Sequence, residues 1–258
     1  MRLGRTWLGY TRPVSDPRKP DRRGRFITIE GPEGAGKSTM AIQLRDELVR
    51  GGVPAVLTRE PGGTAIGEGI RALLLAKDDG PIPTAVADAF LFNAARAQLV
   101  VQVILPALER GETVICARFA DSTLAYQGYG AGLPIDGLRA LEAFATGGLK
   151  PDLTILLDLP VRVGLARKAG DEINRFEAVL DLSFHDRVRA GFREMARQEP
   201  ARFVVIDATV PPDTVSAAIR AAVSERFPEH DEALRDHSRP RGDRVSGEPA
   251  NTAVRTTR

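Results

Sequence analysis

Five short apolar runs alternate along the chain with longer segments of helical periodicity. The runs are rich in β-branched residues, and they read FITIE at 26–30, AVLT at 55–58, TVICA at 113–117, LTILLD at 153–158 and FVVID at 203–207. Strands that are separated by helices pair in parallel, through helical crossovers. The pattern therefore predicts an α/β fold in which helices flank a five-stranded parallel sheet.

Apolar residues at helical spacing predict seven helices, at 38–50, 65–76, 85–110, 135–146, 161–169, 177–198 and 213–226. In 85–108, 18 of 24 residues are apolar, which is more than one amphipathic face requires. We expect this helix to be buried on most sides or shared with a partner subunit. Polar residues and Pro106 interrupt it, so we do not expect it to span a membrane.

Composition divides the 258 residues into three parts. Residues 1–25 carry eight basic and two acidic residues, and 228–258 are poor in apolar residues, so we expect a basic disordered extension and a disordered tail around a folded domain at 26–227. A single cysteine, Cys116, excludes an intramolecular disulfide. Without a signal-like apolar run near Met1 we expect a cytoplasmic protein. The basic extension lacks an aromatic platform, so we expect neither nucleic acid nor membrane as a partner.

A glycine-rich loop follows the first predicted strand directly. Residues 31–38 read GPEGAGKS, which fits the phosphate-binding pattern G-x-x-x-x-G-K-[ST] in its strand–loop–helix context. Backbone N–H groups in such a loop surround phosphate oxygens, Lys37 reaches the transferred phosphate, and the Ser38 hydroxyl is suited to Mg²⁺. The predicted ATP-binding residues are Gly31, Pro32, Glu33, Gly34, Ala35, Gly36, Lys37, Ser38 and Thr39. The chain has no N-K-x-D run for guanine, and its size suits a nucleotide kinase.

Three further motifs follow the phosphate loop: TREPGGT at 58–64, FNAAR at 92–96 and RFADSTLAYQG at 118–128. Together they resemble bacterial thymidylate kinases over about 25–227. The resemblance implies a P-loop nucleoside monophosphate kinase fold with a short lid at 169–177. It also implies transfer of the ATP γ-phosphoryl group to dTMP, giving dTDP, with Mg²⁺ and a homodimer.

The resemblance assigns roles to individual residues. It implies Lys37, Arg118 and Arg175 as catalytic residues, and Arg59, Phe92, Arg96, Arg118, Thr123, Tyr126 and Gln127 as the dTMP site. In it Phe92 stacks on the base, Arg96 bonds a thymine carbonyl, Tyr126 crowds the sugar 2′ position and Glu33 approaches the 3′ hydroxyl. Alternatives are core packing for Phe92, a surface ion pair for Arg59, an exposed loop charge for Glu33 and solvated helix charges for Arg167 and Lys168. Arg96 lies in an almost entirely apolar helix, so it should face a polar ligand or a carboxylate.

One position departs from the family pattern. The family has Asp directly before the Arg that follows the third strand, and this chain has Ala117. Either Ser38, the phosphates and water hold the metal without this acid, or turnover is reduced. Asp158, at the end of the fourth strand, is a weaker candidate for the missing acid. Two alternatives to a dTMP kinase therefore stay open: a kinase of a modified pyrimidine nucleotide, and a nucleotide-binding protein with weak or lost turnover.

Overall fold

The computed structural model describes residues 6–7, 10–11, 23–75, 83–168 and 181–235. Five strands form one sheet: β3 (Phe26–Glu30), β4 (Ala55–Arg59), β5 (Thr113–Ala117), β6 (Leu153–Asp158) and β7 (Phe203–Asp207). Their order is β4-β5-β3-β6-β7, and every neighbouring pair is parallel. The predicted fold class is confirmed, and all five strands lie where the apolar runs indicated, with Arg59 added to β4. A separate antiparallel pair joins β1 (Thr6–Trp7) to β2 (Tyr10–Thr11).

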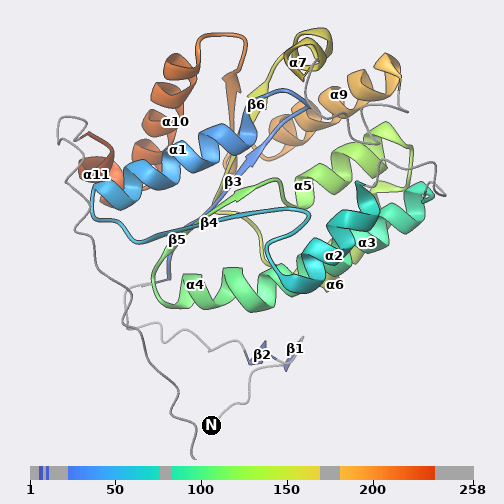
Figure 1. The fold of residues 1–258 in the computed structure, drawn as a ribbon, viewed down its shortest axis with the longest axis horizontal. Coiled ribbons are helices and arrows are strands. Elements are labelled where there is room, and N and C mark those ends of the chain that lie inside the picture. The colour runs from blue at the N-terminus through green and yellow to red at the C-terminus, as the bar shows by residue number, and fades with distance from the viewer. Residues whose placement is uncertain (1–5, 8–9, 12–22, 76–82, 169–180, 236–258) are drawn as a thin grey trace, which may run out of the picture.

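Helices cover both faces of the sheet (Figure 1). On one face lie α1 (Lys37–Arg50) and α10 (Pro212–Arg226), which pack on Ile27 and Ile29 of β3. On the other lie α3 (Ala85–Leu99), η1 (Val100–Ile104), α4 (Leu105–Glu109), η2 (Leu124–Gly130), α6 (Ile135–Thr146) and α9 (Leu182–Gln198). Three further short helices are α2 (Ala65–Leu74), α5 (Ala120–Thr123) and α7 (Val161–Lys168). The predicted helix ends differ from these by at most two residues, apart from 76, 169 and 177–180, which lie outside the described residues.

Alternation along the strands decides which side chains meet each helical layer. Successive side chains of a strand point to opposite faces of the sheet. On β3, Ile27 and Ile29 pack in the α1 cluster, while Phe26 packs with η1 and α4 on the other face. On β5, Ala117 belongs to the α1 cluster and Cys116 to the opposite one. The side chains of Glu30 and Ala117, the last residues of these two neighbouring strands, therefore point to opposite faces of the sheet.

The predicted long helix at 85–110 is divided into three parts. Between α3 and α4 lies η1, a π-helical segment that ends two residues before Pro106. Proline lacks the N–H that an α-helix needs and its ring crowds the preceding turn, so the hydrogen-bond pattern changes there. By length and composition alone, Ala85–Glu109 could cross a membrane. In this fold its Leu99, Val100 and Ile104 are fully buried against the sheet.

The ordered domain is longer than the sequence predicted at its C-terminal end. The predicted disordered tail began at 228, but η3 (Pro228–His230) and α11 (Asp231–Arg235) follow α10 directly. Leu234 is 2% exposed and joins the α1 cluster, and His230 Nε2 lies 2.9 Å from the Thr113 hydroxyl. The folded domain therefore includes residues 228–235 as well. The segment was missed because it buries few apolar residues in a charged stretch.

Candidate active site

The phosphate loop lies between the carboxyl end of β3 and the start of α1. Gly34 and Gly36 have φ angles of 69° and 83°, in the left-handed region that glycine adopts without steric cost. A Cβ on Gly34 would lie 2.0 Å from the carbonyl oxygen of Gly164, so this position also excludes larger residues sterically. The loop leads into the N-terminus of α1, whose first N–H groups and helix dipole favour an anion. Ser38 and Thr39 are exposed there.

Lys37 is buried at the base of the loop. Its side chain donates a hydrogen bond to the carbonyl oxygen of Pro32 at 2.6 Å. Burial, followed by the nearby positive charge of Arg118, lowers the pKa of Lys37 to about 7. An anion beside this ammonium group would favour its charged form, because an opposite charge at close range stabilises it.

Glu33 of this loop meets two side chains that follow β5, Arg118 and Tyr126. Nη2 of Arg118 lies 2.7 Å from Oε1 of Glu33, and the Tyr126 hydroxyl donates to the same oxygen at 2.9 Å. Although burial opposes it, the charges of Arg118, Lys37 and Lys168 hold the pKa of Glu33 well below its usual range. Glu33 is therefore an ionised carboxylate that bridges the phosphate loop and the residues after β5, and not an exposed loop charge.

Several of the residues assigned to dTMP line the same wall of the site. The side chain of Gln127 is 3% exposed, yet its amide makes no hydrogen bond with the described residues. Thr123 also faces the cavity, and its hydroxyl accepts a hydrogen bond from Arg96 at 3.0 Å. Phe92 contributes an aromatic surface. This wall offers hydrogen-bonding groups and an aromatic surface, as a nucleobase requires.

Arg59 lines the cavity but has a surface partner. Its Nη2 lies 3.0 Å from Oε1 of Glu68 on α2, and both side chains are about half exposed. The pair matches the alternative raised for Arg59 from the sequence. Exposed pairs of this kind are worth little free energy, so the guanidinium can exchange its partner for a phosphate.

Arg96 differs from its expected position at the base. It is 1% exposed and does not line the cavity; its Nη2 lies 2.7 Å from Oε2 of Glu60, which is also buried. Asn93, Thr123 and the carbonyl of Phe119 accept its other hydrogen bonds. The expectation that this buried guanidinium meets a carboxylate is met by Glu60. Sequence reasoning missed Glu60, because no local pattern links it to a residue 36 positions away.

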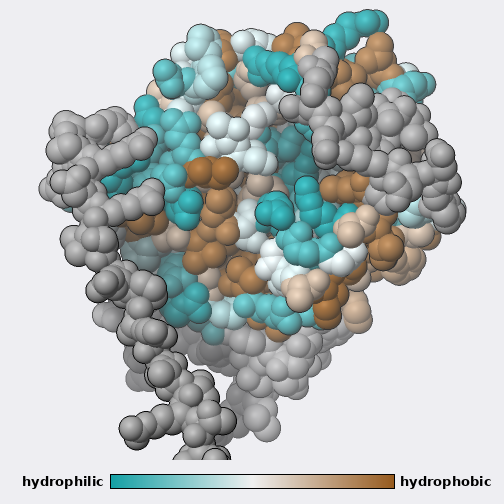
Figure 2. All heavy atoms as spheres, viewed as in Figure 1, coloured by the Kyte–Doolittle hydropathy of each residue, from teal (hydrophilic) through white to brown (hydrophobic). Residues whose placement is uncertain are grey.

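One cavity of about 530 Å³ brings most of these groups together. Figure 2 shows hydrophilic side chains around a hollow in the middle of the face that Figure 1 views. Of the residues predicted from sequence, the cavity is lined by Glu33, Gly34, Gly36, Lys37, Ser38, Thr39, Arg59, Phe92, Arg118, Thr123, Tyr126 and Gln127. Gly31, Pro32, Ala35 and Arg96 lie behind its wall, and Arg175 lies outside the described residues.

Three cations line the cavity although the sequence did not assign them to it, and one acid that the sequence offered for the metal does not line it. Arg167 and Lys168, interpreted as solvated helix charges, line the cavity, and the Lys168 ammonium is 3.7 Å from Glu33. Arg71 lines it as well and was not singled out. Asp158 is held by Arg189 through contacts of 2.7 and 2.9 Å and does not line the cavity. It therefore does not supply the acid that Ala117 lacks.

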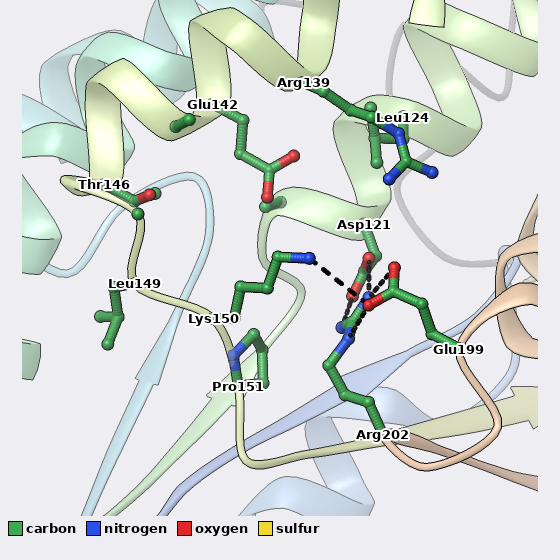
Figure 3. Close-up of a pocket in the computed structure, with 13 residues that line it drawn as sticks. Asp121, Leu124, Arg139, Glu142, Thr146, Leu149, Lys150, Pro151, Glu199 and Arg202 are labelled. Atoms are coloured by element: carbon green, nitrogen blue, oxygen red, sulfur yellow. Dashed lines mark hydrogen bonds and ion pairs between the residues drawn. The ribbon is translucent and has the colours of Figure 1, made fainter. Parts of the chain in front are cut away.

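A second, smaller cavity of about 170 Å³ shares α5 with the first. Figure 3 shows Arg202 reaching Asp121 and Glu199, with Lys150 directed at Glu199. The Asp121 carboxylate accepts from both terminal nitrogens of Arg202, at 2.6 and 2.9 Å. Burial raises the pKa of Glu142, on its far wall, to about 7. This cluster holds α5 from the side opposite the main cavity.

A phosphate loop at the carboxyl edge of a parallel sheet, with cations around an adjoining cavity, defines an ATP-dependent nucleoside monophosphate kinase of the P-loop class. The thymidylate kinase family model matches residues 29–219. A thymidylate kinase of Desulfovibrio desulfuricans is 54% identical over 206 residues, covering 77% of this chain and 94% of that protein. One of Deinococcus radiodurans is 51% identical over 205 residues, covering 79% and 98%. The chain belongs to the thymidylate kinase family.

A solved structure agrees with this assignment. The crystal structure of a thymidylate kinase from Ehrlichia chaffeensis aligns with a TM-score of 0.63 and 33% sequence identity. The alignment covers 78% of this chain and 99% of that one. The shared region is thus nearly the whole length of these relatives, and the extra residues of this chain lie outside it.

Proposed function

We infer that this protein phosphorylates dTMP to dTDP with ATP as the donor, as its membership of the thymidylate kinase family indicates. One observation of the site carries the inference furthest: the phosphate loop and Arg118 line the same cavity and meet at the ion pair between Glu33 and Arg118. Phosphoryl transfer needs positioning and charge stabilisation more than covalent chemistry. A donor loop beside an acceptor-side cation supplies both.

The groups that line the cavity have different roles in phosphoryl transfer. The backbone of the phosphate loop binds the β and γ phosphates, and Lys37 neutralises charge on the transferred group. Arg118 holds the dTMP phosphate in line with it, having exchanged part of its contact with Glu33 for the ligand. Arg167 and Lys168 line the cavity, where they stabilise the charge that spreads over the phosphoryl oxygens. Arg175 remains a prediction for the same role.

We place the base against Phe92, Thr123 and Gln127. The amide of Gln127 is the strongest support, because this residue lines the cavity, its amide makes no hydrogen bond with the described residues, and a base edge would supply one. Tyr126, fixed by Glu33 and Arg118, would meet the sugar. Arg96 is adjacent through Thr123, so a hydrogen bond from its guanidinium to a thymine carbonyl stays a prediction.

The residues present fit a Mg²⁺ ion held mainly by phosphates. Ser38 lines the cavity at the start of α1, is exposed, and its hydroxyl makes no hydrogen bond with described residues. Among those residues no group of three or more His, Cys, Asp or Glu side chains could hold a metal alone. Magnesium commonly keeps several waters and takes few protein ligands besides substrate phosphates. When bound there it would neutralise phosphate charge during transfer.

The acceptor site can be tested by separating the kinetics of the two substrates. Gln127→Leu keeps the side-chain volume and removes the amide, so we expect the dTMP KM to rise about tenfold while the ATP KM stays within about threefold. Gln198→Leu, on the exposed end of α9, is the matched control and should leave both constants unchanged. An unchanged dTMP KM in Gln127→Leu would contradict this placement of the base.

We propose a homodimer formed by α2, α3 and α6, which pack side by side (Figure 1). Large apolar side chains are exposed on all three: Ile66, Leu73, Val86, Phe90 and Phe144, each more than half exposed except Val86 at 50%. The family implies the same state. In sedimentation at micromolar concentration, Phe90→Lys should yield monomers, whereas Val49→Lys on α1 should not. A monomeric parent protein would refute the dimer. A cytoplasmic location stays a prediction.

A further inference from the structure

Arg118 has a backbone conformation that is costly for its residue type. Its φ angle is 68°. Among the residues that the structure describes, Arg118 is the only non-glycine residue with a positive φ. Such a conformation persists only where surrounding contacts enforce it, and it is common at functional sites. One contact is the hydrogen bond from its own N–H to the carbonyl oxygen of Ile29, at 3.0 Å.

Besides its contacts with Glu33 and Tyr126, Arg118 is connected through Ser122 to Glu30, the last residue of β3. Its Oε1 accepts the N–H of Phe119 at 2.7 Å, and its Oε2 accepts the Ser122 hydroxyl at 2.7 Å. Glu30 is fully buried, and its position on β3 directs it to the face of Phe26, where α5 lies. It does not line the main cavity, so it does not touch the substrates.

The chain of contacts continues to the guanidinium. The Ser122 oxygen accepts a hydrogen bond from Nη1 of Arg118 at 3.2 Å. A hydroxyl has one hydrogen, and here it is given to Glu30, which leaves the oxygen lone pairs for Arg118. Carboxylate, hydroxyl and guanidinium thus form one polarised chain, in which each bond strengthens the next.

We propose that Glu30 is a positioning residue for phosphoryl transfer, which fixes the Phe119 amide and the Ser122 hydroxyl and thereby directs Arg118 into the cavity. The inference rests on the proposed role of Arg118 at the acceptor phosphate. It also explains why a carboxylate is kept where no solvent reaches it.

The surroundings of Glu30 make this carboxylate costly to keep. Burial, and then the negative charge of Asp121 on α5, raise the pKa of Glu30 to about 7. Asp121 in turn is paired with Arg202 on the far side of α5, as Figure 3 shows. The two carboxylates hold α5 from its two sides, and only Glu30 is connected to Arg118.

The variant Glu30→Gln tests the proposal with almost no change in volume. Phe119 and Ser122 donate to different oxygens of Glu30, and glutamine replaces one of these acceptors with an NH₂ donor, so one of the two donors loses its acceptor in this geometry. If the new side-chain amide donates to the Ser122 oxygen instead, the Ser122 hydroxyl can no longer donate to position 30. The amide then competes with Nη1 of Arg118 for the lone pairs of that oxygen. We expect kcat/KM for dTMP to fall about 10 to 100-fold, with the ATP KM within about threefold.

A matched control lies two residues earlier on the same strand face. Thr28 is fully buried and bonds the Thr154 hydroxyl at 2.9 Å, and Thr154 in turn donates to Asp121 rather than to the Glu30, Ser122 and Arg118 chain. Thr28→Val should lower the urea midpoint while both kinetic constants stay within about threefold. If Glu30→Gln behaves like Thr28→Val, losing stability but keeping its dTMP kinetics, the proposal is overturned. Should Glu30→Gln not fold, Ser122→Ala breaks the same chain, and unchanged dTMP kinetics there would overturn the proposal equally.

A double-mutant cycle shows whether Glu30 acts through Arg118. In an Arg118→Ala background, Glu30→Gln should cost less than about threefold, because the group that it positions is gone. The full loss in both backgrounds would overturn the proposal. If Arg118→Ala alone leaves dTMP kinetics unchanged, the proposed role of Arg118 fails as well. Failure of the Arg118 role is therefore distinguishable from failure of the Glu30 role, in which Arg118→Ala impairs dTMP kinetics and Glu30→Gln leaves them unchanged.

Discussion

Arg96 and Glu60 form a buried ion pair beside the main cavity, which Glu60 helps to line, with 2.7 Å between Nη2 and Oε2 and both side chains at most 3% exposed. Glu60 follows β4 directly and donates its N–H to the carbonyl of Ala117, so the pair links the ends of β4 and β5 to α3. The positions that sequence motifs assign to substrate are therefore fixed partly by a structural ion pair.

Breaking this pair should destabilise the protein strongly. Arg96→Ala leaves Glu60 buried and unpaired, so we expect the free energy of unfolding to fall by about 3 to 5 kcal/mol in urea titration. Arg59→Ala, which breaks an exposed pair, should cost about 0.5 kcal/mol or less. Equal losses in the two variants would contradict the structural role of Arg96.

Replacing both partners separates the structural role of Arg96 from binding. Arg96→Met combined with Glu60→Leu removes the pair without leaving a buried charge, and much of the stability should return. If Arg96 also bonds the base, the dTMP KM of this folded variant should remain raised about tenfold or more. A normal dTMP KM would show that Arg96 serves the fold alone.

Lys37 should take up a proton when ATP binds at alkaline pH. Its pKa of about 7 means that it is mostly neutral at pH 8, and the polyphosphate restores its charged form. Below pH 7 the Lys37 side chain is already protonated before ATP binds, so the proton uptake on ATP binding disappears as the pH falls. Calorimetry of a non-hydrolysable ATP analogue in buffers of different ionisation enthalpy should give up to about one proton at pH 8.

The variant Lys37→Arg supplies the control for proton uptake. Arginine stays charged throughout this range, so ATP binding to Lys37→Arg should proceed without uptake. The absence of uptake by the parent protein at pH 8 would contradict the lowered pKa of Lys37.

The C-terminal segment should behave as part of the domain. Ending the chain after Phe227 removes Ala233 and Leu234 from their contacts with α1, and should cost about 2 to 4 kcal/mol of unfolding free energy. Ending it after Arg235 should leave both stability and kinetics within error. Urea titration compares the two, and equal stability would return the domain boundary to 227.

Ala117 should limit turnover. Its side chain belongs to the α1 face and lines the cavity, whereas Glu30 serves the other face and so cannot replace the acid that the family has here. Losing such a partner of a metal costs about 10 to 100-fold, so Ala117→Asp should raise kcat about tenfold and lower the Mg²⁺ requirement. Ala117→Asn introduces a side chain of the same size as aspartate but without its charge, so it should neither raise kcat nor lower the Mg²⁺ requirement. A parent protein as fast as Ala117→Asp across the Mg²⁺ titration would refute this.

The sequence was sufficient where local patterns carry the information. Apolar runs located all five strands, and the loop at 31–38 located the phosphate site, because both depend on adjacent residues. It was insufficient for Glu60 and Glu30, whose partners lie 36 and 89 or more positions away, and whose importance arises from burial that only the packed sheet creates. Ala233 and Leu234 were missed because two adjacent apolar residues in a charged segment give no periodicity.

The most direct test of the account is a coupled assay of ATP with dTMP, dUMP, dCMP and dGMP as acceptors, run on the parent protein and on Lys37→Ala. We expect dTMP to give the highest kcat/KM, and we expect turnover in Lys37→Ala to be abolished, because the main fixed charge on the transferred phosphate is lost. The thymine methyl contributes only about 1 to 3 kcal/mol, so dUMP should be a weaker but measurable acceptor. Preference for another acceptor, or equal turnover by Lys37→Ala, would contradict the assignment.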